Sequence, residues 1–165
     1  YIVETSEDYG TQSGPLISPR LFREMIKPRR KELNDFIKRR WPHVKILHHS
    51  CGAIWELIDD LIDTGIDILN PIQPLASGMD SKKLKEVFGS RICFDGGIDT
   101  QRALCGSQDE LEAEVRRRIR ALAPGGGYIL APSNHIQRDV PPENVVALFE
   151  FAKKYGRYPI DLGEE

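Results

Sequence analysis

The chain has 165 residues, with 23 lysines and arginines against 25 aspartates and glutamates, so its net charge at pH 7 is −2. Hydrophobic residues make up 40% and charged residues 29%, which is typical of an ordinary soluble globular chain. This balance argues against a general nucleic-acid binder, because such proteins carry a clear excess of basic residues. No apolar run approaches the roughly 20 residues that a membrane-spanning helix needs.

Strand-like and helix-like patterns alternate along the chain, beginning with a strand at 1–4. The expected strands are 1–4, 44–48, 66–69, 91–94 and 128–131, and the expected helices are 21–37, 54–62, 81–88, 111–122 and 141–154. Ser18 caps the first helix, Pro19 takes its first position, and Pro28 is expected to kink or break it. The fold class is therefore α/β, with five strand–helix units and a parallel sheet. Two architectures fit: a doubly wound sheet, or part of a (β/α)8 barrel.

The three cysteines are widely spaced and odd in number, which does not suggest a disulfide framework. Reduced thiols predict a cytoplasmic protein.

Polar side chains gather after each expected strand, where the active site of a parallel α/β protein lies. The alternative is that they only cap helices. On the first interpretation, Tyr9 and Asp99 are candidates for catalysis. The candidate substrate-binding residues are Asp8, Gln12, Asn70, Gln73, Gln101, Asn134 and Gln137.

His49 and Cys51 form the sharpest chemical pattern, because both side chains can point to one ion from the end of a strand. Zinc accepts this pair of ligands, and a catalytic zinc site needs a third protein ligand and one open position. The alternative is a buried thiol beside a hydrogen-bonded histidine. His48 is expected to face the opposite way, since neighbouring side chains of a strand alternate.

His135 follows the last expected strand, in the same layer as His49. Three chemical roles fit it: metal ligand, general acid or base, or hydrogen-bond donor to a substrate carboxylate. A purely structural role is the alternative.

Several motifs resemble the C-terminal half of the uroporphyrinogen decarboxylase superfamily. They are His49-Ser50-Cys51-Gly52, Asn70-Pro71-Ile72-Gln73, and the segments 94–101, 132–137 and 140–144. The resemblance covers 1–158 and leaves 159–165 as a C-terminal tail. It implies a (β/α)8 barrel, for which about 250 residues is typical. The chain would then hold about five of the βα units.

The resemblance implies two chemistries. One is methyl transfer between a corrinoid on a partner protein and a thiol-type acceptor, assisted by zinc, and His49 and Cys51 match its first two ligands. Asn134 stands where this branch carries a further cysteine, so either His135 supplies the third ligand or no metal binds. Asp99, Asn70 and Gln73 would orient the acceptor or the ligands. The His-x-Cys pattern favours this branch.

The other chemistry is decarboxylation of uroporphyrinogen III without a cofactor. His135 would then contact a carboxylate or transfer a proton, with Tyr9 as a weaker candidate. Either reaction implies a small-molecule substrate.

A third hypothesis is a catalytically incomplete fragment. Five barrel units leave two sheet edges unpaired, so the chain could form a homodimer through them.

Overall fold

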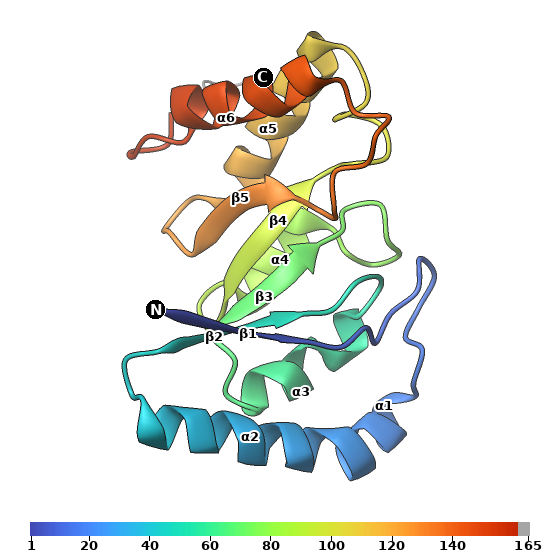
Figure 1. Ribbon diagram of the computed structural model, residues 1–165, viewed down its shortest axis with the longest axis vertical. Coiled ribbons are helices and arrows are strands. Elements are labelled where there is room, and N and C mark those ends of the chain that lie inside the picture. Colours follow the sequence, from blue (N-terminus) through green and yellow to red (C-terminus); the bar gives the residue numbers. More distant parts are fainter. Residues whose placement is uncertain (162–165) are drawn as a thin grey trace.

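The computed structural model describes residues 1–161 and contains a five-stranded sheet with helices between the strands (Figure 1). The strands are β1 (Ile2–Ser6), β2 (Lys45–His49), β3 (Ile68–Ile72), β4 (Cys93–Ile98) and β5 (Tyr128–Pro132). The α-helices are α1 (Pro19–Leu21), α2 (Lys27–Arg40), α3 (Ile58–Asp63), α4 (Ser81–Phe88), α5 (Gln108–Leu122) and α6 (Pro142–Tyr155). A π-helix, η1 (Phe22–Ile26), joins α1 to α2, and a 3-10 turn, η2 (Trp55–Leu57), precedes α3.

The order of the strands decides between the two architectures expected from the sequence. All neighbouring strands are parallel and follow chain order, β1-β2-β3-β4-β5. A doubly wound sheet reverses its strand order at a switch point, whereas a (β/α)8 barrel keeps chain order throughout. The prediction of an α/β fold built as part of such a barrel is confirmed.

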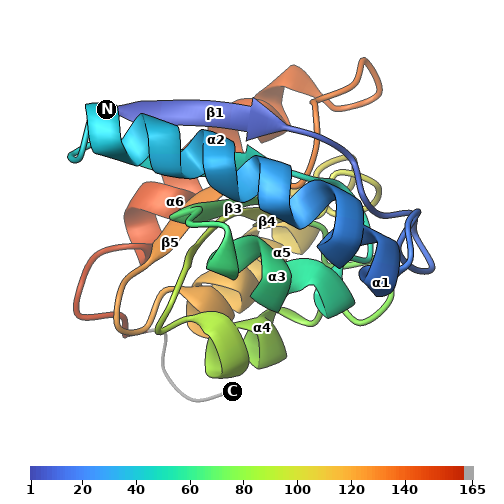
Figure 2. The same cartoon turned by 90° about the horizontal axis from the view of Figure 1, so that it is seen from below.

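The helices follow the strands along their outer side, with α2 and α3 beside β1 to β3, and α5 and α6 beside β4 and β5 (Figures 1 and 2). The apolar side chains between these two layers form the core. One cluster includes Ile46, Leu69 and Phe94 from the sheet with Ile37, Leu61 and Leu84 from the helices. A second cluster includes Ile98, Leu111, Val115, Ile119 and Leu148. Burial of these side chains provides the main free energy that holds the helices on the sheet.

The helical segment at 19–40 begins as expected and continues past the predicted break. The Ser18 hydroxyl accepts a hydrogen bond from the Leu21 amide at 3.3 Å, and Pro19 follows it in the first helical position. The helix does not break at Pro28, and the kink expected there as the alternative stays a prediction. Pro28 lies in the first turn of α2, directly after η1, so the wider π-helical turn accommodates the proline without ending the helix.

The strands extend further toward their C-terminal ends than the apolar runs predict. Strand pairing continues through polar residues, with Ser6 opposite His49 and His49 opposite Asn70. Side chains opposite each other in parallel strands share one face of the sheet. The C-terminal ends of β1, β2 and β3 therefore carry polar groups on the face away from the helices.

The last described residues include part of the expected C-terminal tail. Residues 159–161 have no helix or strand, and residues 162–165 of that predicted tail lie outside the described part. Among the described helices, none combines the length and apolar character required to cross a membrane.

Candidate functional site

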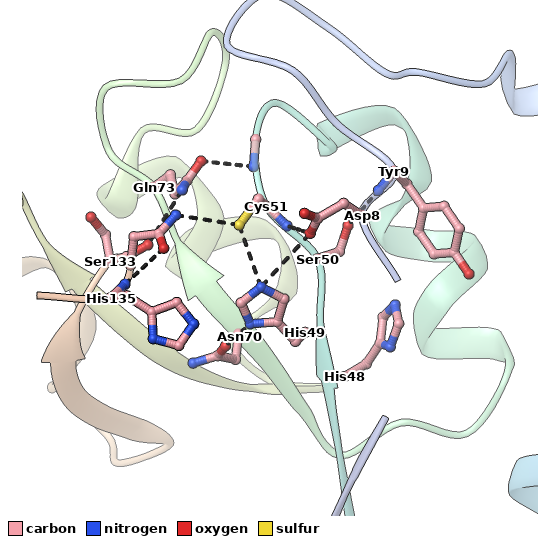
Figure 3. A network of polar contacts seen from close by, with 12 residues as sticks. Asp8, Tyr9, His48, His49, Ser50, Cys51, Asn70, Gln73, Ser133 and His135 are labelled. Carbon is pink, nitrogen blue, oxygen red and sulfur yellow. Dashed lines mark hydrogen bonds and ion pairs between the residues drawn. The ribbon is translucent and has the colours of Figure 1, made fainter. Parts of the chain in front are cut away.

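The end of β2 and the loop after β1 bring together three side chains with metal-binding atoms. Asp8, His49 and Cys51 each offer one such atom, and these atoms all lie within 4.8 Å of one another. The Cys51 sulfur lies 3.4 Å from Nε2 of His49, and a carboxylate oxygen of Asp8 lies 3.7 Å from the same nitrogen. Figure 3 shows the three side chains converging. The pair that the sequence singles out is thus joined by a carboxylate from the loop after β1.

Backbone contacts between the two loops position this group. The Cys51 amide donates a hydrogen bond to Oδ1 of Asp8 at 2.8 Å. The next residue along, Tyr9, donates its own amide to the buried Ser50 hydroxyl at 3.0 Å. Hydrogen bonds at Asp8 and Tyr9 therefore fix the loop after β1 against the end of β2, and they direct the Asp8 carboxylate at Cys51.

The donor atoms fit a catalytic zinc site. Carboxylate oxygen, imidazole nitrogen and cysteine sulfur are the three ligand types that zinc takes in proteins, and three protein ligands leave a position for a reactant. Without a cation, burial of Cys51 and the negative charge of Asp8 raise the pKa of its thiol to about 11, against a small opposing effect of Asn134. A divalent cation among the three groups would reverse this effect, because it favours the thiolate.

The other nitrogen of His49 faces β3. Its Nδ1 lies 2.7 Å from Oδ1 of Asn70. Asp95 lies in the neighbouring strand β4, where burial raises the pKa of its carboxyl and the nearby Asn70 side chain lowers it. Polar side chains of three adjacent strands, His49, Asn70 and Asp95, therefore lie near one another.

A cavity of about 290 Å³ lies beside His49. It is lined by Glu4, Ser6, His49, Asn70, Pro71, Pro132, Asn134 and His135. The His135 side chain lies on this wall, outside the group of Asp8, His49 and Cys51. Asn134 reaches that group instead, since its amide donates to the Cys51 sulfur at 3.5 Å. The cavity is large enough for a small molecule in contact with both His49 and His135.

Gln73 holds the loops around this cavity together. Its side-chain oxygen accepts a hydrogen bond from the Gly52 amide at 2.8 Å, and its side-chain nitrogen donates to the Ser133 carbonyl at 3.4 Å. Gln73 is buried. Its predicted role in binding substrate stays a prediction, but its contacts are those of a bridge between the loops after β2 and β5.

His48 and Tyr9 lie on the opposite side of β2, as the alternation of side chains predicts for His48 (Figure 3). The Tyr9 hydroxyl accepts a hydrogen bond from Arg30 at 2.9 Å, and Arg30 also donates to Nδ1 of His48 at 3.2 Å. Burial and the Arg30 charge lower the pKa of His48 to about 3. Burial raises the pKa of Tyr9. These groups belong to the layer between the sheet and α2, so Tyr9 is not brought to the cavity.

The remaining predicted residues lie apart from this group. Asp99 is buried at the end of β4, where its carboxylate accepts from the Gln101 amide at 2.8 Å and its amide donates to Glu114 of α5 at 3.2 Å. Its contacts are therefore with a turn and an outer helix. The side chains of Gln12, Gln101 and Gln137 are exposed.

Asp95 was not among the residues predicted from the sequence, although its carboxyl lies near enough to Asn70 for that side chain to lower its pKa. It directly follows the apolar run 91–94, and it therefore looked like the first residue of a loop. It lies inside β4, opposite Ile129 of β5. Asp95 comes two residues after Cys93, so the two side chains lie on the same face of β4. Cys93 pairs with Ile68 of β3, and this alternation is the sequence signal that could have identified Asp95.

Comparison with known proteins decides the family. Residues 6–155 match the family model of uroporphyrinogen decarboxylase (URO-D). The chain belongs to the URO-D family. The superfamily expected from its motifs is confirmed.

Curated relatives carry the name of the decarboxylase. A uroporphyrinogen decarboxylase from Chlorobium luteolum is 29% identical over 138 residues, which cover 81% of this chain and 37% of the relative. One from Trichodesmium erythraeum is 26% identical over 138 residues, covering 84% and 37%. The chain thus spans little more than a third of the length of these relatives.

Among solved structures, a methyltransferase from Methanosarcina mazei is similar to this URO-D family chain, with a TM-score of 0.75 and 25% sequence identity. The match covers 94% of this chain and 42% of the methyltransferase. The fold is therefore shared along nearly all of the chain, while the names of the relatives point to two different reactions.

Proposed function

We propose that this chain is part of a zinc-assisted methyltransferase that moves a methyl group between a corrinoid on a partner protein and a thiol-type acceptor. The observation that carries the proposal is the convergence of Asp8, His49 and Cys51, with their ligand atoms within 4.8 Å of one another beside a cavity. The similarity to a methyltransferase from Methanosarcina mazei supports it.

Asp8, His49 and Cys51 would hold the zinc ion, which supplies Lewis acidity that lowers the pKa of a bound thiol. The corrinoid on the partner protein would supply the methyl group and would keep the electron pair of its bond to that carbon. The acceptor sulfur would take the methyl group, and a base of this chain would take the thiol proton.

Three further residues of the chain have separate roles in the proposed reaction. Asn134 donates to the Cys51 sulfur and so stabilises its thiolate form. His135 lies on the cavity wall, where it can accept the thiol proton or donate to an anionic group of the acceptor. Asn70 holds Nδ1 of His49. The cavity of about 290 Å³ favours a small acceptor.

Metal analysis of the purified protein tests this proposal. We expect about one zinc ion per chain under reducing conditions, and loss of most of it in Asp8→Ala, His49→Ala and Cys51→Ser. Cys105→Ser is the matched control, because Cys105 lies outside the group and should not affect zinc content. A wild-type protein without stoichiometric zinc would contradict the proposal.

The second candidate function is decarboxylation of uroporphyrinogen III, which the curated relatives favour by name. His135 would then act on a substrate carboxylate, with no metal required. The assay is formation of coproporphyrinogen from uroporphyrinogen. Decarboxylation that survives loss of both His49 and Cys51 would favour this function over methyl transfer.

A further inference from the structure

We infer that the groove between α4 and α5 is a binding site for a small molecule that carries two or more phosphate groups. The two helices pack side by side on the outer side of the sheet (Figure 2). A cavity of about 550 Å³ lies between them, within the range of about 300–1,000 Å³ that small-molecule pockets occupy. None of its described lining residues also lines the cavity beside His49. This α4–α5 groove is therefore separate from the proposed zinc site.

The groove does not lie at an open edge of the described sheet. The two outer edges are on β1 and β5, whereas α4 connects β3 to β4 and α5 connects β4 to β5. α5 packs in addition against α6. The shape of the groove therefore depends on helices that are each held by described neighbours.

Positive charge predominates in the α4–α5 groove. Two acidic residues line it, Asp80 and Glu86, and Asp80 already accepts the Lys83 amide at 2.9 Å as the cap of α4. The basic residues of the lining are Lys82, Lys85, Arg117, Arg118 and Arg120. Five positive charges against two negative ones leave an excess of three, and like charges held close together repel one another. A bound polyanion would relieve this repulsion.

Arg118 is the buried basic residue of the groove, with only 8% of it exposed. Its Nε and Nη2 donate to the two carboxylate oxygens of Glu114 at 2.8 and 3.2 Å, and its Nη1 donates to the buried Ser81 hydroxyl at 2.9 Å. The hydrogen bonds found among the described residues leave one N–H on Nη1 and one on Nη2 for a ligand. A planar guanidinium held in a fixed orientation suits the bidentate recognition of phosphate.

The other basic groups keep charge that no nearby carboxylate cancels. Arg117 lies 3.8 Å from Oε2 of Glu114, the oxygen that also accepts from Nη2 of Arg118, so one carboxylate faces two guanidinium groups. Lys85 donates to the Gly126 carbonyl, which is an uncharged acceptor. Lys82 is exposed, and no ion pair of it is found within the described residues. Both helices therefore present cationic groups to an anion in the groove.

The size and charge of the groove favour a polyphosphate over a single small anion. The cavity is larger than one phosphate group needs, and two phosphate groups carry about three negative charges near neutral pH. The methylene groups of Lys82 and Lys85 and the methyl group of Ala121 offer apolar surface to the rest of such a molecule.

Calorimetric titration of the 165-residue chain with sodium pyrophosphate tests the site. The protein is kept metal-free, because pyrophosphate would also bind zinc. We expect one saturable site per chain, weakened about 10-fold or more in Lys82→Gln combined with Arg117→Gln, since two charged donors are lost. Arg39→Gln combined with Arg40→Gln is the matched control, because it removes two positive charges from the exposed end of α2 and should change the affinity less than about 2-fold.

NMR spectra of the same titration locate the bound anion. The Nε–H resonance of Arg118 should shift as pyrophosphate is added, and the imidazole resonances of His49 should not. No saturable binding, equal weakening in the two double variants, or shifts at His49 without shifts at Arg118 would overturn the inference. A short DNA duplex that binds more tightly than pyrophosphate would assign the groove to nucleic acid and would likewise overturn it.

Discussion

At the scale of single residues, Cys51 shows how strongly neighbours set reactivity. Its thiol has a pKa of about 11 because it is buried and because Asp8 adds a negative charge and a hydrogen bond. Only the thiolate reacts with alkylating agents. The metal-free thiol should therefore be unreactive near neutral pH.

We predict that alkylation of Cys51 rises about tenfold per pH unit between pH 8 and pH 10, measured by peptide mass spectrometry after removal of metal with a chelator. Asp8→Asn removes the second cause of the raised pKa and leaves burial, so the rate at pH 8 should rise by roughly 3–10-fold. Cys105 in the same digest is the internal control. Equal rates in wild type and Asp8→Asn would contradict this account.

The lowered pKa of His48 should make the free energy of unfolding depend on pH. Its folded-state pKa of about 3 lies below the ordinary histidine value of 6.5, so the unfolded chain takes up a proton first as the pH falls. The contribution of neutral His48 to stability is complete above pH 6.5 and is lost toward pH 3. Between pH 7 and pH 5 the loss should be about 2 kcal/mol.

Urea unfolding at both pH values measures this loss, and His48→Gln should remove it because glutamine does not titrate. His43→Gln is the control, since His43 is exposed. A His48→Gln variant with the full pH dependence of the wild type would show that other groups are responsible.

At the scale of elements, α5 begins with a complete capping box, in which both reciprocal hydrogen bonds are present. The Ser107 hydroxyl accepts from the Glu110 amide at 3.3 Å, and the Glu110 carboxylate accepts from the Ser107 amide at 2.7 Å. Ser107→Ala should lower the free energy of unfolding by about 1 kcal/mol in urea titrations. Ser107→Thr keeps the accepting oxygen and should lose less. Equal losses in both variants would show that the cap contributes little.

Hydrophobic periodicity predicted the existence and order of the elements but not their ends. Apolar residues report burial against the helices, so the pattern stopped where polar residues began. Strand pairing depends on backbone groups and continues through His49, Asn70 and Asp95. Pro28 suggested a kink or a break because proline lacks the amide proton of an α-helical residue, but a π-helical turn precedes it and the helix continues.

The site was predicted in part. His49 and Cys51 are two residues apart, so their convergence is a local property that the sequence displays. Asp8 was expected to bind substrate, and its approach to Cys51 depends on how the loop after β1 packs against the end of β2. Tyr9 and Asp99 have suitable chemistry, but the loop after β1 places Tyr9 against Arg30 of α2, and the turn after β4 places Asp99 beside α5.

At the scale of the whole molecule, the described sheet has two outer edges, on β1 and β5. Unpaired parallel edges favour association between chains. Val3 of β1 is 36% exposed. We predict that the 165-residue chain associates in a concentration-dependent way in sedimentation experiments, and that Val3→Lys reduces this association.

Val87→Lys is the matched control, because Val87 is 50% exposed on α4, away from either edge. Association that is unaffected by Val3→Lys, or equally reduced by Val87→Lys, would show that the β1 edge is not the surface involved.

The bridge made by Gln73 has a consequence for redesign of the cavity. One buried amide sets the separation of the loops after β2 and β5, which carry Cys51 and Asn134. A shorter or longer side chain at position 73 would move one loop relative to the other without altering any residue that lines the cavity. The width of the opening, and with it the size of molecule admitted, can thus be adjusted from a single position behind the site.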